Sequence, residues 1–343
     1  MADGGEGTVD AFVETGARRV VVRVCGPLGA DVEASFALDG TTAIVEMAAA
    51  SGLALVPPEA RDALRASTYG TGELIRAALD AGARRIVVAA GGSATTDGGA
   101  GCLQALGLRL YDPTGAGVGR GGNALHHVAA IDASRLDPRL RGVDIEVAAD
   151  VDTPLCGPAG AAAVFAPQKG ATAAQALALD AALTHFADRS AAVLGRDVRE
   201  VPGAGAAGGL AFGLHAFLGA SVRPGVDIVA ELRGLPAALA GAEICLTGEG
   251  SIDAQTLRGK TVAGVARLAR AAGAGTVIAF GGRVTSEAET ELARAGVLTV
   301  PICDGPLTLD EACRDAAALL ERAAARATLL YLARSTMEGR EAR

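Results

Sequence analysis

The pattern of hydrophobic and polar positions predicts short strands alternating with helices. β-Branched and apolar runs at residues 84–90, 145–149, 276–280 and 298–302 predict strands. Apolar positions at helical spacing predict helices at 72–80, 173–194 and 309–332. Residues 18–24, 32–38 and 43–47 predict a small antiparallel meander. Strands that alternate with helices indicate a parallel sheet in the second half, whereas the front part indicates a smaller, mixed unit. The fold class is therefore α/β. No linker composition divides the two parts, so we expect interleaved domains.

Composition and charge exclude several kinds of partner. The chain has 343 residues, a formal net charge of −8 and no basic run, and its aromatic residues are seven Phe and three Tyr without Trp. Nucleic acid therefore is not an expected partner. Residues 204–222 are the most apolar long run, but their glycines and histidine favour a buried helix over a membrane span. The six cysteines are scattered and form no C-x-x-C pair, which indicates reduced thiols. The N-terminus lacks the apolar core of a signal peptide. Both observations lead us to expect a cytoplasmic protein.

A glycine-rich stretch follows the predicted strand 84–90 and precedes a helix. Residues 91–101, GGSATTDGGAG, contain the candidate ligand-binding residues Gly91, Gly92, Ser93, Thr95 and Asp97. Glycines let a backbone approach an anion, and a helix start offers unpaired N–H groups to it. The alternative is a tight turn with Asp97 as helix N-cap. The density of these residues favours the anion cradle, and the absence of G-x-G-x-x-G argues against a nicotinamide cofactor.

Two carboxylates follow the predicted strand 145–149. Asp150 and Asp152 would face the same side if the strand continued, and would then repel each other without a cation or donor between them. They are candidates for Mg²⁺ ligands or for a general base. A turn before Pro154 explains them equally well.

A second strand, glycine loop and helix occur at residues 242–268. The apolar run 244–246 predicts a strand that ends near Thr247. A small-residue loop with polar and charged groups follows before a helical pattern. Such a loop at the carboxyl end of a strand is typical of ligand sites in open α/β sheets. Its candidate residues are Gly248, Glu249, Gly250, Asp253 and Lys260.

Three further features stay open at this stage. Lys169 either binds a phosphate or carboxylate as a point charge or is an exposed lysine in a turn. The stretch 203–209 is again glycine-rich and contains Gly205 and Gly208. Glu6 lies in an N-terminal glycine loop and belongs either to the rim of an anion site or to a plain turn.

These motifs together resemble the bacterial glycerate kinase family, which transfers a phosphoryl group from ATP to glycerate. The resemblance extends over nearly the whole chain. The matching segments are ADGGEGT (2–8), EMAAASGL (46–53), TYGTGELI (68–75), GGSATTDGGAG (91–101), DVDTPLCGPAGAAAVFAPQKGA (150–171), PGAGAAGGL (202–210) and TGEGSIDAQTLRGK (247–260).

The resemblance implies two α/β domains with the site between them. One is Rossmann-like with a mainly parallel sheet, which we assign to residues 1–15, 48–106 and 220–343. The other is smaller with a mixed sheet, which we assign to residues 16–47 and 107–219.

The resemblance also implies ATP with Mg²⁺ and a small hydroxy acid. We expect transfer of the ATP γ-phosphoryl group to D-glycerate, with 2-phosphoglycerate favoured. The glycine loops at 91–101, 203–209 and 248–250 would cradle anionic groups, and Lys169 and Lys260 would neutralise phosphate charge. Asp150 and Asp152, or Glu249 and Asp253, would hold Mg²⁺ or accept the hydroxyl proton.

Family members usually carry a further strand and an Asp-Ser-Phe-Lys-like segment before ADGGEG. We expect weakened activity and stability without it. The alternatives to a glycerate kinase are a kinase of another small hydroxy acid and a nucleotide-binding scaffold without turnover. A homodimer is left open.

Overall fold

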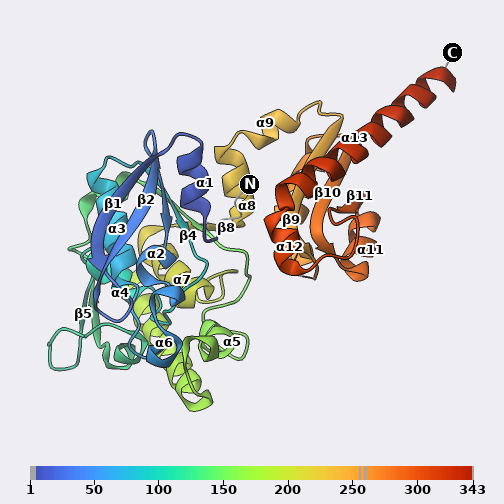
Figure 1. Cartoon of the computed structure of the whole chain (residues 1–343). Coiled ribbons are helices and arrows are strands. Elements are labelled where there is room, and N and C mark those ends of the chain that lie inside the picture. The colour runs from blue at the N-terminus through green and yellow to red at the C-terminus, as the bar shows by residue number, and fades with distance from the viewer. Residues whose placement is uncertain (1–4, 255, 259–260, 342–343) are drawn as a thin grey trace. The chain divides into compact units, whose positions relative to one another are not determined.

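The computed structural model describes residues 5–254, 256–258 and 261–341. The chain divides into two compact units, Ala2–Ile228 and Val229–Arg343 (Figure 1). We call them the N-terminal unit and the C-terminal unit. Helix α8 (Gly225–Leu232) contains the boundary between them.

A six-stranded mixed sheet forms the centre of the N-terminal unit. Its strand order is β1-β2-β3-β4-β7-β8. The first two pairs are antiparallel, which confirms the predicted meander, and the remaining pairs are parallel. The strands are β1 (Arg18–Cys25), β2 (Asp31–Asp39), β3 (Thr42–Glu46), β4 (Arg85–Ala89), β7 (Asp144–Ala148) and β8 (Ser221–Arg223). A separate antiparallel pair consists of β5 (Arg109–Tyr111) and β6 (Ala130–Asp132).

The N-terminal unit has two large hydrophobic clusters, of which the first packs helices against this sheet. Leu74 and Ile75 of α3 are fully buried in the cluster that includes Phe36 and Val45 of the sheet. The second cluster gathers under α6 around Phe186. The helices are α1 (Thr8–Glu14), α2 (Ala48–Ser51), α3 (Tyr69–Asp80), α4 (Ala100–Ala105), α5 (Ala161–Phe165), α6 (Ala173–Leu194) and α7 (Ala206–Leu218). The 3₁₀ turns are Leu53–Leu55, Pro58–Ala60, Gly122–His127, Pro138–Gly142 and Pro167–Lys169.

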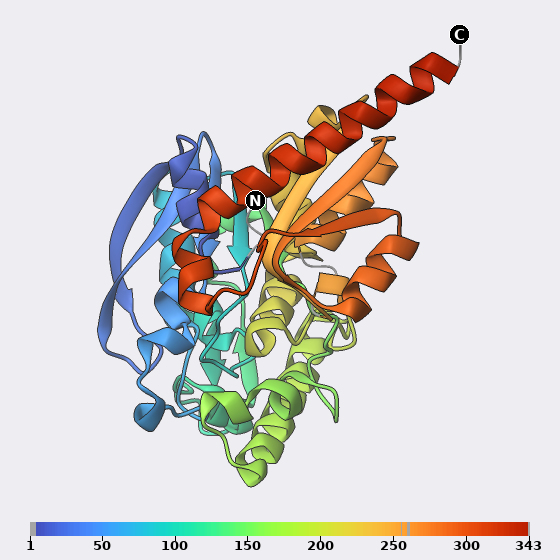
Figure 2. The same ribbon diagram turned by 45° about the vertical axis from the view of Figure 1, so that its right-hand side comes forward.

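The C-terminal unit contains a parallel sheet of order β11-β10-β9. Helix α13 lies across one face of this sheet, where Ile278 and Phe280 of β10 pack against Ala323 and Ala327 (Figure 2). The strands are β9 (Ile244–Ile252), β10 (Thr276–Val284) and β11 (Val297–Pro301). The remaining elements are α9 (Leu235–Leu239), a 3₁₀ turn (Thr256–Arg258), α10 (Thr261–Ala271), α11 (Ser286–Arg294), α12 (Leu309–Arg314) and α13 (Ala316–Glu341).

The α/β class is confirmed, with one parallel and one mixed sheet, but the two units differ from the predicted domains. The mixed sheet belongs to the larger unit, not the smaller one. Residues 16–47 and 48–106 were assigned to different domains, yet they supply the neighbouring strands β3 and β4, where Ala43 lies opposite Ile86. Hydrogen bonds of one sheet therefore join them.

None of the helices in the described part of the chain has the length and apolar character of a membrane span.

Candidate functional site

Loops that follow parallel strands of the N-terminal unit carry most of the predicted site residues. Residues 91–93 follow β4, and Asp150 and Asp152 follow β7. The two strands end at the same level, because the Ala90 N–H donates to the Ala148 carbonyl at 3.0 Å. Ligands of open α/β sheets bind outside such carboxyl ends. We call this edge, with its loops, the carboxyl edge.

Gly91, Gly92 and Ser93 are the part of the glycine-rich stretch that reaches solvent. Both glycines are exposed, Ser93 is half-buried, and the next residues are buried. Gly92 has a φ of 69°, and a Cβ there would lie 2.2 Å from Glu6 Oε1. The Glu6 side chain therefore lies against Gly92, which places it at the rim of the carboxyl edge.

Lys169 is buried beneath this loop. Its side chain reaches Ser93 Oγ at 2.9 Å and the Thr95 carbonyl oxygen at 2.5 Å, and the residue is only 2% exposed. Burial lowers the pKa of Lys169 to about 7, and the nearby Asp97 carboxylate opposes this shift. Lys169 is therefore neither an exposed turn residue nor a surface point charge. It can influence a ligand only through the residues it holds.

Asp97 organises the glycine-rich stretch from inside. The residue is fully buried, and its carboxylate accepts hydrogen bonds from Ser67 Oγ (3.2 Å), Thr68 N (2.8 Å) and Thr68 Oγ1 (3.0 Å), and from the N–H groups of Gly99 (3.2 Å) and Gly101 (3.3 Å). Burial raises the pKa of Asp97, and these donors partly offset the shift. The carboxylate is thus enclosed by the fold, in contrast to the predicted contact with a ligand.

Thr95, Gly205 and Gly208 are also interior residues. A Cβ at Gly205 would lie 2.3 Å from the Pro154 carbonyl oxygen, and one at Gly208 would lie 1.9 Å from that of Thr95. At both positions the backbone packs directly against another backbone segment, and glycine fits there because it has no Cβ. The stretch 203–209 therefore closes against the loops of the carboxyl edge and does not present the predicted open cradle.

The Asp150 and Asp152 side chains are exposed beyond the end of β7. Asp150 Oδ1 accepts a hydrogen bond from the Gly225 N–H at 3.0 Å, so the start of α8 fixes its position. Mg²⁺ in phosphoryl-transfer sites is held by one or two carboxylates, substrate phosphates and water. This pair fits that role. Within the described ranges, no group of three or more His, Cys, Asp or Glu side chains could hold a metal by itself.

Sequence reasoning missed Glu46 and Thr68. Glu46 ends β3, and its Oε1 accepts a hydrogen bond from the Val9 N–H at 2.7 Å, which caps α1 beside the loop of Glu6. Burial raises the pKa of Glu46, and the hydrogen bond from Val9 opposes this. Thr68 donates to the Asp97 carboxylate from its backbone N–H and from its hydroxyl. Both residues lie in segments that resemble the glycerate kinase family, EMAAASGL and TYGTGELI. The resemblance was therefore the signal that could have identified them.

The C-terminal unit overturns one local prediction. Strand β9 does not end near Thr247 but continues to Ile252, because its parallel pairing with β10 runs on to Ser251 opposite Arg283 and Ile252 opposite Val284. Gly248, Glu249 and Gly250 therefore belong to a strand and not to a glycine loop at a helix start.

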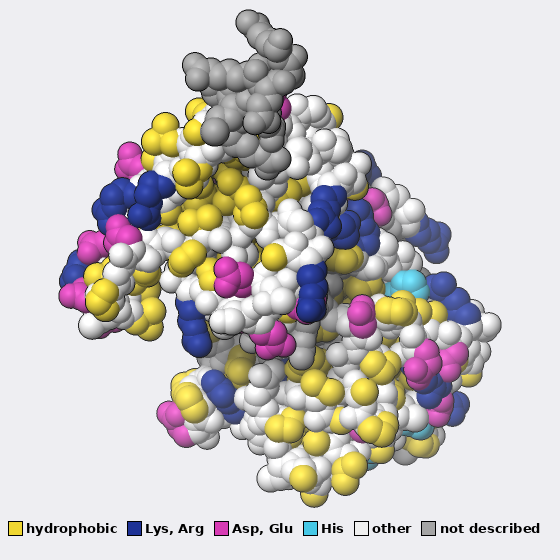
Figure 3. Space-filling model, turned by 90° about the vertical axis from the view of Figure 1, so that its right-hand side faces the viewer, with side chains coloured by type: hydrophobic (Ala, Val, Ile, Leu, Met, Phe, Trp, Pro, Cys, Tyr) yellow, Lys and Arg dark blue, Asp and Glu magenta, His cyan; other side chains and the backbone are white. Residues whose placement is uncertain are grey.

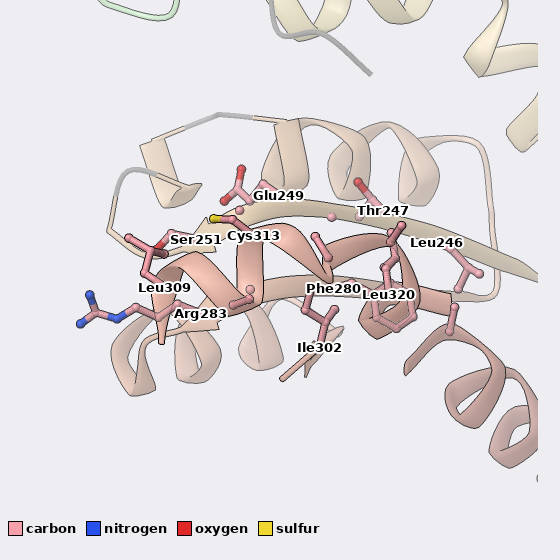
Figure 4. Close-up of a pocket in the computed structure, with 17 residues that line it drawn as sticks. Leu246, Thr247, Glu249, Ser251, Phe280, Arg283, Ile302, Leu309, Cys313 and Leu320 are labelled. Atoms are coloured by element: carbon pink, nitrogen blue, oxygen red, sulfur yellow. The ribbon is translucent and has the colours of Figure 1, made fainter. Parts of the chain in front are cut away.

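These three residues line a pocket of about 940 Å³ in the C-terminal unit (Figure 4). Leu246, Phe280, Ile302 and Leu320 supply apolar walls, and Arg283 is among the polar lining residues. Hydrophobic side chains are also exposed on the surface shown in Figure 3, and Leu309 and Leu330 of this unit are 78% and 74% exposed.

Glu249, within β9, and Asp253, just after it, both form a hydrogen bond with Thr256. Thr256 Oγ1 donates to Glu249 Oε1, and the Asp253 N–H donates to Thr256 Oγ1 at 3.0 Å. The Asp253 carboxylate accepts from Ser251 Oγ at 3.2 Å. Thr256 thus links the two predicted acidic residues, and Lys260 lies outside the described residues.

Parallel strands with polar loops at their carboxyl ends define an α/β protein built to bind a small ligand. The model of the glycerate kinase family matches residues 1–332, so the chain belongs to this family and the predicted resemblance is confirmed. It is 48% identical over 327 residues to the glycerate kinase of Bacillus subtilis (strain 168), covering 94% of this chain and 85% of that one. Over 274 residues it is 50% identical to the glycerate 2-kinase of Escherichia coli (strain K12), covering 79% and 72%.

A solved structure agrees with this assignment. The chain superposes with a TM-score of 0.83 on the crystal structure of putative glycerate kinase 2 from Salmonella typhimurium LT2. The two are 44% identical, and the match covers 98% of this chain and 88% of that chain.

Proposed function

We propose that this protein is an ATP-dependent glycerate kinase that converts D-glycerate and ATP into 2-phosphoglycerate and ADP. The observation that carries the proposal is the 48% identity to a glycerate kinase over 94% of the chain. The choice of the 2-hydroxyl rests on the relative from Escherichia coli, which is named glycerate 2-kinase.

In this reaction the 2-hydroxyl oxygen of glycerate forms a bond to the γ-phosphorus of ATP. The bond between that phosphorus and the β–γ bridging oxygen breaks, ADP leaves, and the hydroxyl proton passes to a base. Asp150 and Asp152 at the carboxyl edge would divide the two tasks that need a carboxylate, which are metal binding and proton acceptance. Mg²⁺, when bound, would neutralise the charge of the phosphates.

The residues of the C-terminal unit have proposed roles as well. Gly248 and Gly250 leave the exposed surface of β9 without side chains, where the backbone can approach a ligand closely. Glu249, Asp253 and Lys260 remain candidates for contacts to the nucleotide and its metal.

Release of ADP from the purified full chain, with ATP, Mg²⁺ and D-glycerate, tests this function. We expect turnover that needs all three, with 2-phosphoglycerate identified by phosphorus NMR. Glycerate replaced by other small hydroxy acids should give slower release.

Two carboxamide variants and a matched control test the carboxyl edge. Asp150→Asn and Asp152→Asn should each lower kcat at least about tenfold, because a neutral amide replaces a carboxylate that binds the metal or accepts the hydroxyl proton. Asp144→Asn should leave kcat unchanged, since Asp144 is exposed at the opposite end of β7. Release of ADP without a need for glycerate would refute the proposed function, and unaltered rates in both variants would refute the roles of these aspartates.

A further inference from the structure

We propose that the Ser93 hydroxyl donates a hydrogen bond to an anionic oxygen of a substrate, and that Lys169 is the positioning residue that orients it. The oxygen belongs either to the carboxylate of the hydroxy acid or to a phosphate of ATP. This choice of ligands rests on the proposed function.

The contacts of Ser93 leave its proton for a ligand. Ser93 Oγ accepts a hydrogen bond from Lys169 Nζ at 2.9 Å. A hydroxyl that accepts one hydrogen bond still has its own O–H to donate. No described residue accepts that donation at hydrogen-bond distance. Because Ser93 is half-buried beside two exposed glycines, this O–H can turn toward solvent at the carboxyl edge.

The backbone around Ser93 is fixed on both sides. The Leu53 N–H donates to the Gly92 carbonyl at 2.8 Å, and the Ala94 N–H donates to the Ser51 carbonyl at 2.9 Å. Gly52 and Ser93 thus form an antiparallel bridge. With the backbone held, the remaining freedom is rotation of the hydroxyl, and the contact with Lys169 sets its position.

Lys169 itself is out of reach of a ligand. It is 2% exposed, and its ammonium group also donates to the Thr95 carbonyl at 2.5 Å. A buried cation next to a half-buried hydroxyl strengthens that hydroxyl as a donor to an anion, because the charge is little screened by water.

This arrangement predicts how the affinity depends on pH. The charged groups around the site are the Asp97 carboxylate on the glycine-rich stretch, Arg61, which donates to the Gln168 carbonyl at 3.2 Å, and Glu6 against Gly92. Burial lowers the pKa of Lys169 to about 7, so its positive charge is present below that pH and is lost above it. The neutral amine retains two N–H groups, enough for both of its contacts. Titration of Lys169 therefore changes the charge beneath Ser93 without breaking the hydrogen bonds of Lys169 to Ser93 and Thr95.

Binding experiments separate the two sources of the anionic oxygen. Dissociation constants of D-glycerate alone and of ATP with Mg²⁺ are measured by calorimetry on the full chain between pH 6 and 8.5. We expect Ser93→Ala to weaken one of the two ligands about tenfold or more, which identifies the source, because a hydrogen bond to a charged group is lost. Ser93→Thr should restore most of the affinity. Ser134→Ala, at an exposed serine of the same unit, should change neither.

The pH profile tests the positioning role of Lys169. In the wild type, affinity for the same ligand should fall as the pH rises through about 7. Lys169→Met should weaken that ligand and remove this pH dependence, which a purely structural loss would not do. If Lys169→Met fails to fold, Ser93→Ala and the wild-type profile decide the question.

Two results would overturn the proposal. One is a folded Ser93→Ala variant whose dissociation constants for both ligands stay within twofold of the wild type. The other is a wild type that binds neither ligand or whose affinities are the same at pH 6 and pH 8.5. A protein that shows the expected binding without turnover would refute the proposed function and leave this inference intact.

Discussion

Two buried threonines of the N-terminal unit, Thr68 and Thr96, allow a matched test of how the glycine-rich stretch is held. Both are 0% exposed. Thr68 Oγ1 donates to the Asp97 carboxylate at 3.0 Å and accepts from the Cys102 N–H at 2.9 Å. Thr96 Oγ1 is buried without a hydrogen-bond partner in the part of the chain that the structure describes. Replacing each threonine by valine removes the hydroxyl while retaining the shape of the side chain.

Only the first of the two substitutions should destabilise the protein. Thr68→Val leaves a buried N–H without an acceptor and takes one donor from a buried carboxylate, and each such loss costs about 1–3 kcal/mol. We therefore expect the free energy of unfolding to fall by about 3 kcal/mol. Thr96→Val breaks no hydrogen bond and replaces a desolvated hydroxyl by a methyl group, so stability should stay the same or rise by up to about 1 kcal/mol.

Calorimetric melting of the two variants measures this difference. For a unit of this size, 1 kcal/mol corresponds to about 2–4 °C in Tm, so Thr68→Val should melt roughly 6–12 °C lower than the wild type. Thr96→Val should melt at the wild-type temperature or up to about 4 °C above it. If Thr96→Val lowered Tm as much as Thr68→Val, the Thr96 hydroxyl would have a partner, and the argument from an unsatisfied group would be wrong.

Two further matched pairs test the sheet and the glycines. The Glu146 side chain is 4% exposed and forms ion pairs with Arg85 and Arg223, at 2.5 Å each. Glu146→Gln should therefore lower the free energy of unfolding, measured in urea, by about 2–3 kcal/mol. Asp80→Asn, at the exposed ion pair with Arg139, should lower it by less than about 1 kcal/mol. Equal costs would contradict the role of burial. Gly208→Ala should prevent stable folding or lower the free energy of unfolding by more than about 4 kcal/mol, because a Cβ would lie 1.9 Å from a backbone oxygen. At Gly219, φ is also positive but no atom lies within 4 Å of a Cβ, so Gly219→Ala should lower it by about 1 kcal/mol in the same titration. Similar values for both would show that the left-handed backbone, not the close contact, dominates.

The elements with strong local patterns were predictable from sequence. The strand pattern 84–90 corresponds to β4, and 173–194 coincides with α6, which has a capping box at Thr172 and a left-handed Gly195 at its end. Strand β9 was predicted too short because Gly248 and Gly250 have low intrinsic strand preference. Pairing with β10 overrides that preference, and only the neighbouring strand could reveal it.

The division into units was less accessible, because strand order is a property of distant segments. β4 lies between β3 and β7, and the latter begins 55 residues after β4 ends (residue 89 to residue 144). Hydrophobic periodicity predicts that a strand exists but does not specify its neighbour. The assignment of residues 16–47 and 48–106 to separate domains therefore had no physical basis in local sequence.

The carboxyl edge shows the same limit at the level of single side chains. Asp97 and Asp150 both follow parallel strands, and both stand among small residues that indicate a loop. Asp97 is buried because Ser67 and Thr68, 30 and 29 residues earlier, supply donors to it, while Asp150 stays exposed with the Gly225 N–H as an anchor 75 residues later. The local sequence thus identifies the edge that we propose as the site. Which carboxylate is left exposed there and which one supports the loop is decided by these distant donors.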